Sequence, residues 1–168
     1  SVLVTNDADS VNTAATGVNA QIINGNNSGN VTVDQEGTIN ASDVGIIAAT
    51  NGTGSILVEG AGDVTGGSGA ANPTYGSPAT AANVGIFANQ GGTSGGIHVT
   101  GTGTTSGNDA ILATIDNSAN TSNIVVDRSG DIAVSGTAGW GIVATTAGAG
   151  TVTVEGTGTI AASTSVAG

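Results

Sequence analysis

Val31-Thr-Val-Asp-Gln-Glu-Gly-Thr-Ile39 is the stretch that decides the fold, because its pattern returns along nearly the whole chain. The pattern is a β-branched residue, any residue, Val, three further residues, Gly, one residue and then usually Ile or Val. It returns at 56–64, 97–105, 124–132 and 152–160, and a degenerate copy opens the chain at 2–10. Self-similarity at a fixed period indicates a repeat architecture.

A second motif, Gly-Ile-x-Ala or a close relative, lies between the copies of the first. It occurs at 17–20, 45–48, 85–88, 110–113 and 141–144. Both motifs advance by about 25 to 30 residues, and both lengthen once at the same place, by 41 residues from Gly62 to Gly103 and by 40 from Gly45 to Gly85. This coupling indicates one structural unit that holds both motifs.

Each unit contains three short strand candidates separated by Gly, Asn or Asp. Alternation in Val31-Thr-Val33 places both valines on one face and the threonine on the other, and Ile39 and Ile46 would face inward from the second and third sides. Three strands per turn, each paired with its copy in the next turn, predict an all-β, right-handed parallel β-helix. We expect one solenoid over 1–168, with about six coils of 25–30 residues and the last coil incomplete.

The glycine of the first motif should mark a corner of the coil, where we expect a positive φ. Two polar residues interrupt the otherwise apolar position that follows it, Ser10 and Thr105. We therefore expect distortion of the first and fourth coils at these two positions. The corner glycines are Gly37, Gly62, Gly103, Gly130 and Gly158.

The composition fits a thin repeat core better than an ordinary globule. The 168 residues include 30 Gly, one Trp, one Tyr and one Phe, with no Cys and no Met. Globular cores usually draw on large aliphatic and aromatic side chains, whereas the apolar residues here are mostly Ala, Val and Ile. Disorder is the competing interpretation of so much Gly, Ser, Thr and Asn, but β-branched residues at fixed offsets argue against it.

The charge balance excludes two classes of partner. Twelve acidic residues stand against Arg128 alone, which gives a net charge of −11. A surface that binds phosphate groups needs clustered Lys or Arg, so we expect neither nucleic acid nor an anionic membrane as a partner. No apolar run approaches the length that spans a membrane. The lack of Cys is compatible with secretion through an oxidising compartment.

The lengthened unit contains an insertion at 66–82, which holds both prolines and the only tyrosine, Tyr75. Insertions in solenoids leave from a corner without disturbing the coil. Because binding often resides in loops on a rigid scaffold, Tyr75 is the best single candidate for a ligand contact. The alternative is a tolerated insertion with no binding role.

Acidic residues recur at one outward position, directly after the second inward valine of the first strand. Adjacent coils would place Asp34 beside Glu59, about 5 Å apart, and Asp127 beside Glu155 in the same way. Like charges so close repel unless a cation bridges them. Ca²⁺ prefers carboxylate oxygens, so these four residues are the candidate metal ligands. The alternative is a solvated acidic face that protects sheet edges from aggregation.

No residue set amounts to a catalytic signature, and we expect no enzyme. The best candidate cluster is Asp127, Arg128 and Asp131, because β-helical polysaccharide lyases combine acidic residues with an arginine base. Arg128 is the only arginine, so we interpret the cluster as a local charge pair, which contributes little when exposed. His98 lies alone on the outward side of a strand, with no Ser or Cys motif around it.

The segments Val-Thr-Val-Glu-Gly-Thr-Gly-Thr-Ile at 152–160 and Gly-Trp-Gly-Ile-Val-Ala-Thr-Thr at 139–146 resemble the passenger repeats of Gram-negative autotransporters. The resemblance is periodic and compositional and covers nearly all of the chain. It implies a right-handed β-helix exported to the bacterial cell surface, where it acts as a stalk, adhesin or matrix element. It carries no catalytic residues onto this chain.

The leading functional hypothesis is a structural extracellular β-solenoid that stacks end to end with copies of itself. Solenoid ends expose unpaired strand edges unless terminal repeats blunt them. The alternative is an adhesin segment that binds a cell surface or a glycan through the loop at 66–82. Ca²⁺ is the single cofactor that the residues suggest.

Overall fold

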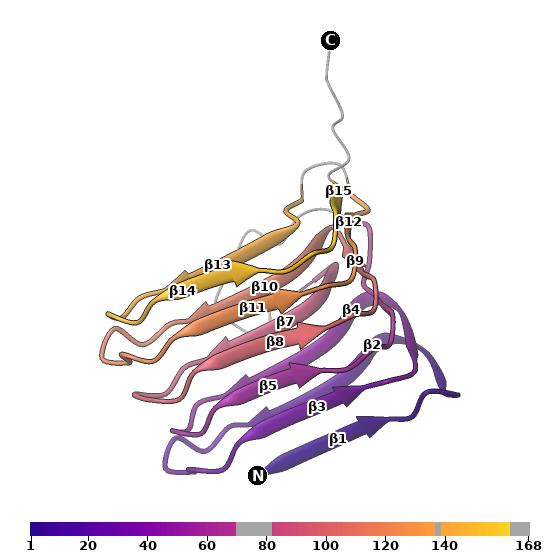
Figure 1. Ribbon diagram of the computed structural model, residues 1–168. Helices are drawn as coiled ribbons and strands as arrows, with labels where there is room; N and C mark the ends of the chain where they lie inside the picture. The colour runs from indigo at the N-terminus through magenta and orange to yellow at the C-terminus, as the bar shows by residue number, and fades with distance from the viewer. Residues whose placement is uncertain (70–81, 137–138, 162–168) are drawn as a thin grey trace.

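The computed structural model describes residues 1–69, 82–136 and 139–161, and every regular element in these ranges is a β-strand (Figure 1). The strands form two parallel sheets. The first sheet consists of β1 (Val2–Asn6), β3 (Val31–Gln35), β5 (Ile56–Glu59), β8 (Ile97–Gly101), β11 (Ile124–Arg128) and β14 (Val152–Glu155). The second consists of β2 (Val11–Ile22), β4 (Thr38–Thr50), β6 (Val64–Thr65), β7 (Val84–Gln90), β9 (Thr105–Gly107), β10 (Asp109–Ile115), β12 (Ile132–Val134), β13 (Ile142–Thr146) and β15 (Ile160–Ala161).

Each turn of the coil contributes one strand to the first sheet, and these strands pair in chain order. Their register aligns the two inward positions of the repeated motif without a slip. The first inward row is Val2, Val31, Ile56, Ile97, Ile124 and Val152, and the second is Val4, Val33, Val58, Val99, Val126 and Val154. The alternation of the motif therefore predicted the register correctly.

The second sheet bends around the other two sides of the coil. β4 covers both of these sides, because its first residues pair with β6 and its last residues pair with β7. β2 pairs with β4 along both sides, and its register shifts between Ala14 and Thr16, where the sheet bends. The three predicted strands per turn are thus present, with two of them fused in the first turns.

The coil is right-handed and has about five turns. In Figure 1 the chain runs along β1 in front, turns at the right-hand side and returns along β2 behind while it climbs towards the C-terminal end. The first side holds six strands within the described residues, and the third side holds five. The predicted β-helix is confirmed, and the expected six coils include a last turn that is incomplete.

The core is a column of Val, Ile and Ala enclosed by the three sides. Ile46, Ile86 and Ile111 face inward from the third side and meet the valines of the first sheet. All three are at most 1% exposed. Full burial of an aliphatic side chain contributes about 1.5–3 kcal/mol, so a core this thin draws its stability from repetition along the column.

A second apolar cluster lies on the outer face of the third side. Ile47, Phe87 and Leu112 are register partners, and each follows an inward isoleucine, so each points away from the column. All three are nevertheless buried. In β4, β7 and β10 the third side is therefore buried on both faces, which sequence reasoning had not anticipated.

The corner glycines are required by close approach and not by positive φ, so the expected reason for them is wrong. None of the five has a φ in the left-handed region. A Cβ at Gly62 would instead collide with the carbonyl oxygen of Gly37 in the preceding turn. The same collision recurs along this corner, one turn after another.

Of the two predicted distortions, the one in the first coil is present and the one in the fourth coil is not. Asn12, and not Ser10, is the register partner of Ile39, because the first turn has two more residues at this corner. Thr105 lies in the row between Val64 and Ile132 with no register shift. The fourth coil is therefore not distorted there, since the hydroxyl of this inward threonine has a partner, described below.

Candidate functional site

The insertion leaves the coil between β6 and β7. Val64 and Ile86 stand 22 positions apart in the chain, whereas their register partners Ile39 and Ile46 stand seven apart. The pairing of both strands with the next turn continues without a break. Tyr75, the predicted contact residue, lies outside the described residues.

The predicted acidic neighbours are register partners on the outer face of the first sheet. Asp34 pairs with Glu59, and Asp127 pairs with Glu155. Thr5 flanks the first pair and Thr100 flanks the second. Over the described residues, no group of three or more His, Cys, Asp or Glu is arranged to hold a metal ion. The adjacency is confirmed, and Ca²⁺ binding at the four carboxylates stays a prediction.

The predicted charge cluster around Arg128 does not form, so that interpretation is wrong. Arg128 is the second residue after inward Val126 in β11, so it also points into the coil, and it is 5% exposed. Asp127 lies between them and points outward. Asp131 is exposed, and its Oδ1 accepts hydrogen bonds from Thr159 N (3.0 Å) and Thr159 Oγ1 (2.7 Å).

The guanidinium of Arg128 donates hydrogen bonds to uncharged acceptors at an interior corner of the coil. Nη1 donates to the carbonyl of Thr100 (2.8 Å), and Nη2 donates to the carbonyl of Gly103 and to Thr105 Oγ1 (2.9 Å). Nε is buried without a hydrogen-bond partner among the described residues. Burial lowers the pKa of the guanidinium, and the negative charge of Asp63 opposes that shift.

Arg128 belongs to an inward column that follows the two valine rows. A side chain in this column needs space, and glycine in a neighbouring turn supplies it. Gly60, Gly101 and Gly156 have φ of 123°, 131° and 141°, a backbone conformation that other residues rarely adopt. The column consists of Asn6, Gln35, Gly60, Gly101, Arg128 and Gly156.

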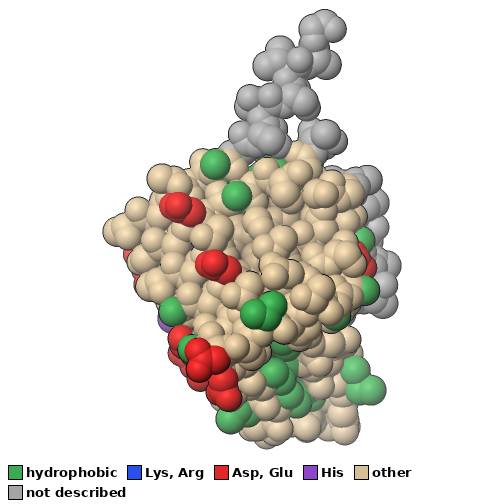
Figure 2. All heavy atoms as spheres, turned by 90° about the vertical axis from the view of Figure 1, so that its right-hand side faces the viewer, with side chains coloured by type: hydrophobic (Ala, Val, Ile, Leu, Met, Phe, Trp, Pro, Cys, Tyr) green, Lys and Arg blue, Asp and Glu red, His purple; other side chains and the backbone are tan. Residues whose placement is uncertain are grey.

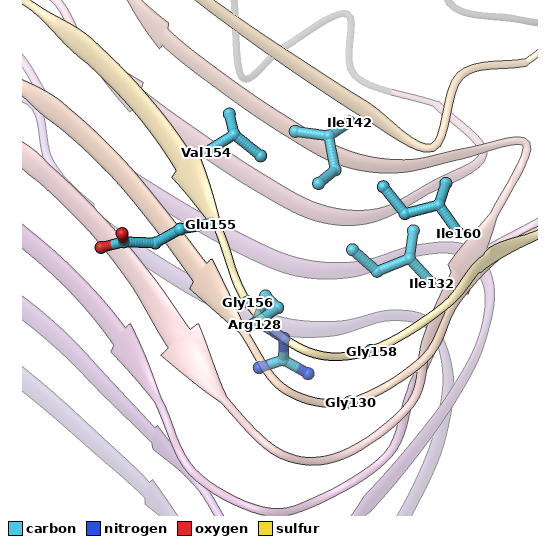
Figure 3. Close-up of a pocket in the computed structure, with 9 residues that line it drawn as sticks. All are labelled: Arg128, Gly130, Ile132, Ile142, Val154, Glu155, Gly156, Gly158 and Ile160. Atoms are coloured by element: carbon cyan, nitrogen blue, oxygen red, sulfur yellow. The ribbon is translucent and has the colours of Figure 1, made fainter.

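A hollow at the C-terminal end of the coil opens onto the core (Figure 3). Ile132, Ile142, Val154 and Ile160 line it and point towards one another, while Glu155 points away from them. The aliphatic stem of Arg128 lies at its floor, beneath Gly156. The hollow is the interior of the coil seen in cross-section, and its lining is mostly apolar.

The inward residues of the last turn are far more exposed than their equivalents below. Val152, Val154 and Ile160 are 40%, 49% and 58% exposed. Their partners one turn earlier, Ile124, Val126 and Ile132, are at most 3% exposed. The outer edge of β14 carries no further strand within the described residues.

The N-terminal end is more polar. Val2 and Val4 are half-buried in β1, whose outer edge is also unpaired within the described residues. Asn12 takes the place that isoleucine or valine holds in most later turns, and its Nδ2 donates to the carbonyl of Gly17 (2.8 Å). This hydrogen bond crosses the corner of the first turn.

Figure 2 shows the side of the coil that lies to the right in Figure 1. Acidic side chains gather on the lower turns, and no Lys or Arg side chain is visible. The single cation, Arg128, is buried. The surface formed by the described residues is therefore acidic and has no exposed Lys or Arg.

Comparison with protein-family models, curated proteins and solved structures finds no match. Within the described residues, no helix has the length and apolar character needed to cross a membrane. The fold and the apolar end of the coil are thus the features that bear on function.

Proposed function

We propose that this chain is a structural β-solenoid of the bacterial cell surface that assembles end to end with copies of itself. One observation carries the proposal. The last turn exposes Val152, Val154 and Ile160, three residues whose equivalents in the turn below are buried. A further turn would remove this apolar area from water at about 25 cal/mol per Å², and a second copy supplies a turn of the same cross-section.

An extracellular location is supported by the surface charge and by the resemblance to autotransporter passengers. A chain with 12 Asp and Glu residues and no exposed Arg or Lys repels nucleic acid and anionic lipid. The same charge keeps separate rods apart along their sides. Contact at the ends, where apolar residues are exposed, then becomes the favourable mode of association.

Electron microscopy of the purified full chain tests the proposal, first with a chelator and then with millimolar calcium. Long fibres one coil wide in both conditions are the expected result. Fibres in calcium alone would indicate a cation site, either at the acidic residues Asp34, Glu59, Asp127 and Glu155 or between two copies. Single short rods or irregular clumps in both conditions contradict end-to-end assembly.

The second candidate is an adhesin segment that binds through the loop at 66–82. The observation in its favour is that the insertion leaves the coil between β6 and β7 while the register on both sides continues. Replacing residues 66–85 by Ala-Ser-Asp-Val-Gly, the five residues at 41–45 in the turn below, removes the loop with a matched connection. Loss of attachment to cells or glycan arrays with an unchanged β-sheet circular dichroism spectrum would support an adhesin, and unchanged attachment would contradict it.

A further inference from the structure

We propose that the joint between two copies is one more parallel rung of the coil, in which β1 of the second copy pairs with β14 of the first. In this register Leu3 stands opposite Thr153, Val2 opposite Val152 and Val4 opposite Val154. The inference rests on the proposed end-to-end assembly and names the surface, the partner and the register of the contact.

The backbone hydrogen bonds between turns define this register. In every turn, the first inward residue of the first sheet donates its N–H to the carbonyl that precedes its equivalent in the next turn. The five bonds are Val2 to Asn30 (2.8 Å), Val31 to Ser55 (3.0 Å), Ile56 to Gly96 (2.9 Å), Ile97 to Asn123 (3.1 Å) and Ile124 to Thr151 (2.9 Å). Val152 N–H is the next donor in this series, and the carbonyl of Ser1 in the second copy is the matching acceptor.

The side chains of the two edges fit the same register. Inside the coil, Ile124 stacks on Val152 and Val126 stacks on Val154. The joint repeats these contacts with Val2 and Val4 of the second copy. In the column that contains Arg128, Asn6 of the second copy would lie against Gly156 of the first. Gly156 has no side chain, so it leaves room for the polar side chain of Asn6, as Gly101 does for Arg128.

The second side of the coil continues in the same way. Ile132 N–H donates to the carbonyl of Thr159 (2.8 Å), and Ile160 N–H would accordingly donate to Val11 of the second copy. Asn12 would then cover Ile160. Its Nδ2 already donates to Gly17 in its own copy, so the joint does not bury this donor unpaired.

Other arrangements of the ends lose these contacts. A slip of one residue would place Leu3 inside and turn Val2 and Val4 to solvent. A symmetric joint between two N-terminal edges would have to be antiparallel, unlike every strand pair in the coil. A head-to-tail joint uses two different surfaces, and because it continues the coil along its own axis it does not close into a ring but builds a filament.

An engineered disulfide tests the register directly. The variant L3C/T153C places two outward cysteines on paired strands about 4.8 Å apart, within the Cα separation of a disulfide. The chain has no native cysteine, so every cross-link formed is the engineered one. The control T5C/T153C is offset by two residues along the strand, beyond the roughly 7 Å limit for a disulfide.

After mild oxidation of the assembled full chain, a ladder of reducible oligomers is expected for L3C/T153C on a non-reducing gel and not for the control. Circular dichroism of the reduced variants verifies that both fold. A ladder for the control alone, or for neither variant while the unmodified chain forms fibres, overturns the register but leaves end-to-end assembly standing. The absence of both fibres and ladders overturns the joint together with the proposed function.

Discussion

Arg128 occupies the space that Gly101 leaves open in the preceding turn. The two residues are register partners on β11 and β8, and Nη1 of Arg128 lies 2.6 Å from the point where a Cβ on Gly101 would stand. The glycine therefore allows the one arginine of the chain to enter the coil. Its guanidinium then donates hydrogen bonds to the backbone carbonyls of Thr100 and Gly103, which face the interior.

Substitution of Gly101 by alanine should destabilise the coil by about 2–4 kcal/mol. The new methyl group would collide with the carbonyl oxygen of Gly60 in the preceding turn and with Nη1 of Arg128. A positive φ at a residue with a side chain adds about 1–3 kcal/mol of strain. Urea unfolding measures the change. Thr102→Ala, at an exposed neighbouring position, is the control, and equal midpoints for the two variants would contradict the packing described here.

Arg128→Ala should lower the free energy of unfolding by about 2–4 kcal/mol, because it leaves a cavity and removes the donors to Thr100 and Gly103. Arg128→Met should cost less, since it refills the space with no charge to desolvate. Thermal unfolding of both variants checks the order. A methionine variant less stable than the alanine variant would contradict this account, because both variants lose the same hydrogen bonds and methionine alone refills the space.

Phe87→Ala should cost about 3–5 kcal/mol even though Phe87 points away from the central column, because its side chain is fully buried. His98→Ala, at an outward and exposed position of the first sheet, should stay within about 0.5 kcal/mol of the parent. Chemical unfolding separates the two. Similar small effects would mean that the outer apolar cluster adds little to stability.

The hydrogen bonds from Thr159 lower the pKa of the Asp131 carboxyl. Their stabilisation is therefore present above the ordinary pKa of about 4 and is lost as the pH falls through the lowered pKa of the folded state. Thr159→Val removes the hydroxyl and keeps the backbone N–H, so the pKa of Asp131 should rise part of the way to its ordinary value. NMR titration of the Asp131 carboxyl measures it, and an unchanged value would contradict the hydroxyl bond.

Assembly should increase with ionic strength, because each copy carries a net charge of −11 and like-charged ends repel. Raising salt from about 10 mM to about 150 mM shortens the Debye length from about 30 Å to about 8 Å. Light scattering at fixed protein concentration follows the growth of fibres. Fibres that dissolve on adding sodium chloride would indicate ionic rather than apolar joints.

The inward rows could be predicted from the sequence because Val31 and Val33 repeat with an unbroken period of two. The same alternation places Arg128 inside, two residues after Val126. That signal was overlooked because a charged side chain is usually assigned to the surface. The corner glycines were predicted at the correct place with the wrong reason, since a collision with a carbonyl of another turn cannot be seen within one strand.

The outer cluster of Ile47, Phe87 and Leu112 also had a signal in the sequence. The residue after the inward isoleucine of the third side is apolar in each of these turns, whereas the matching outward position of the first sheet is mixed. Alternation alone assigns such residues to solvent. The predicted contact at Tyr75 falls outside the described residues, so the structure adds nothing to it.

The burial of Arg128 has a consequence for proteolysis. Trypsin cleaves after Lys or Arg, and this chain offers it one bond, between Arg128 and Ser129. The side chain of Arg128 points into the coil and is only 5% exposed. The folded protein should therefore resist cleavage by trypsin. The rate at which trypsin produces fragments 1–128 and 129–168 would then report how often the later turns of the coil open.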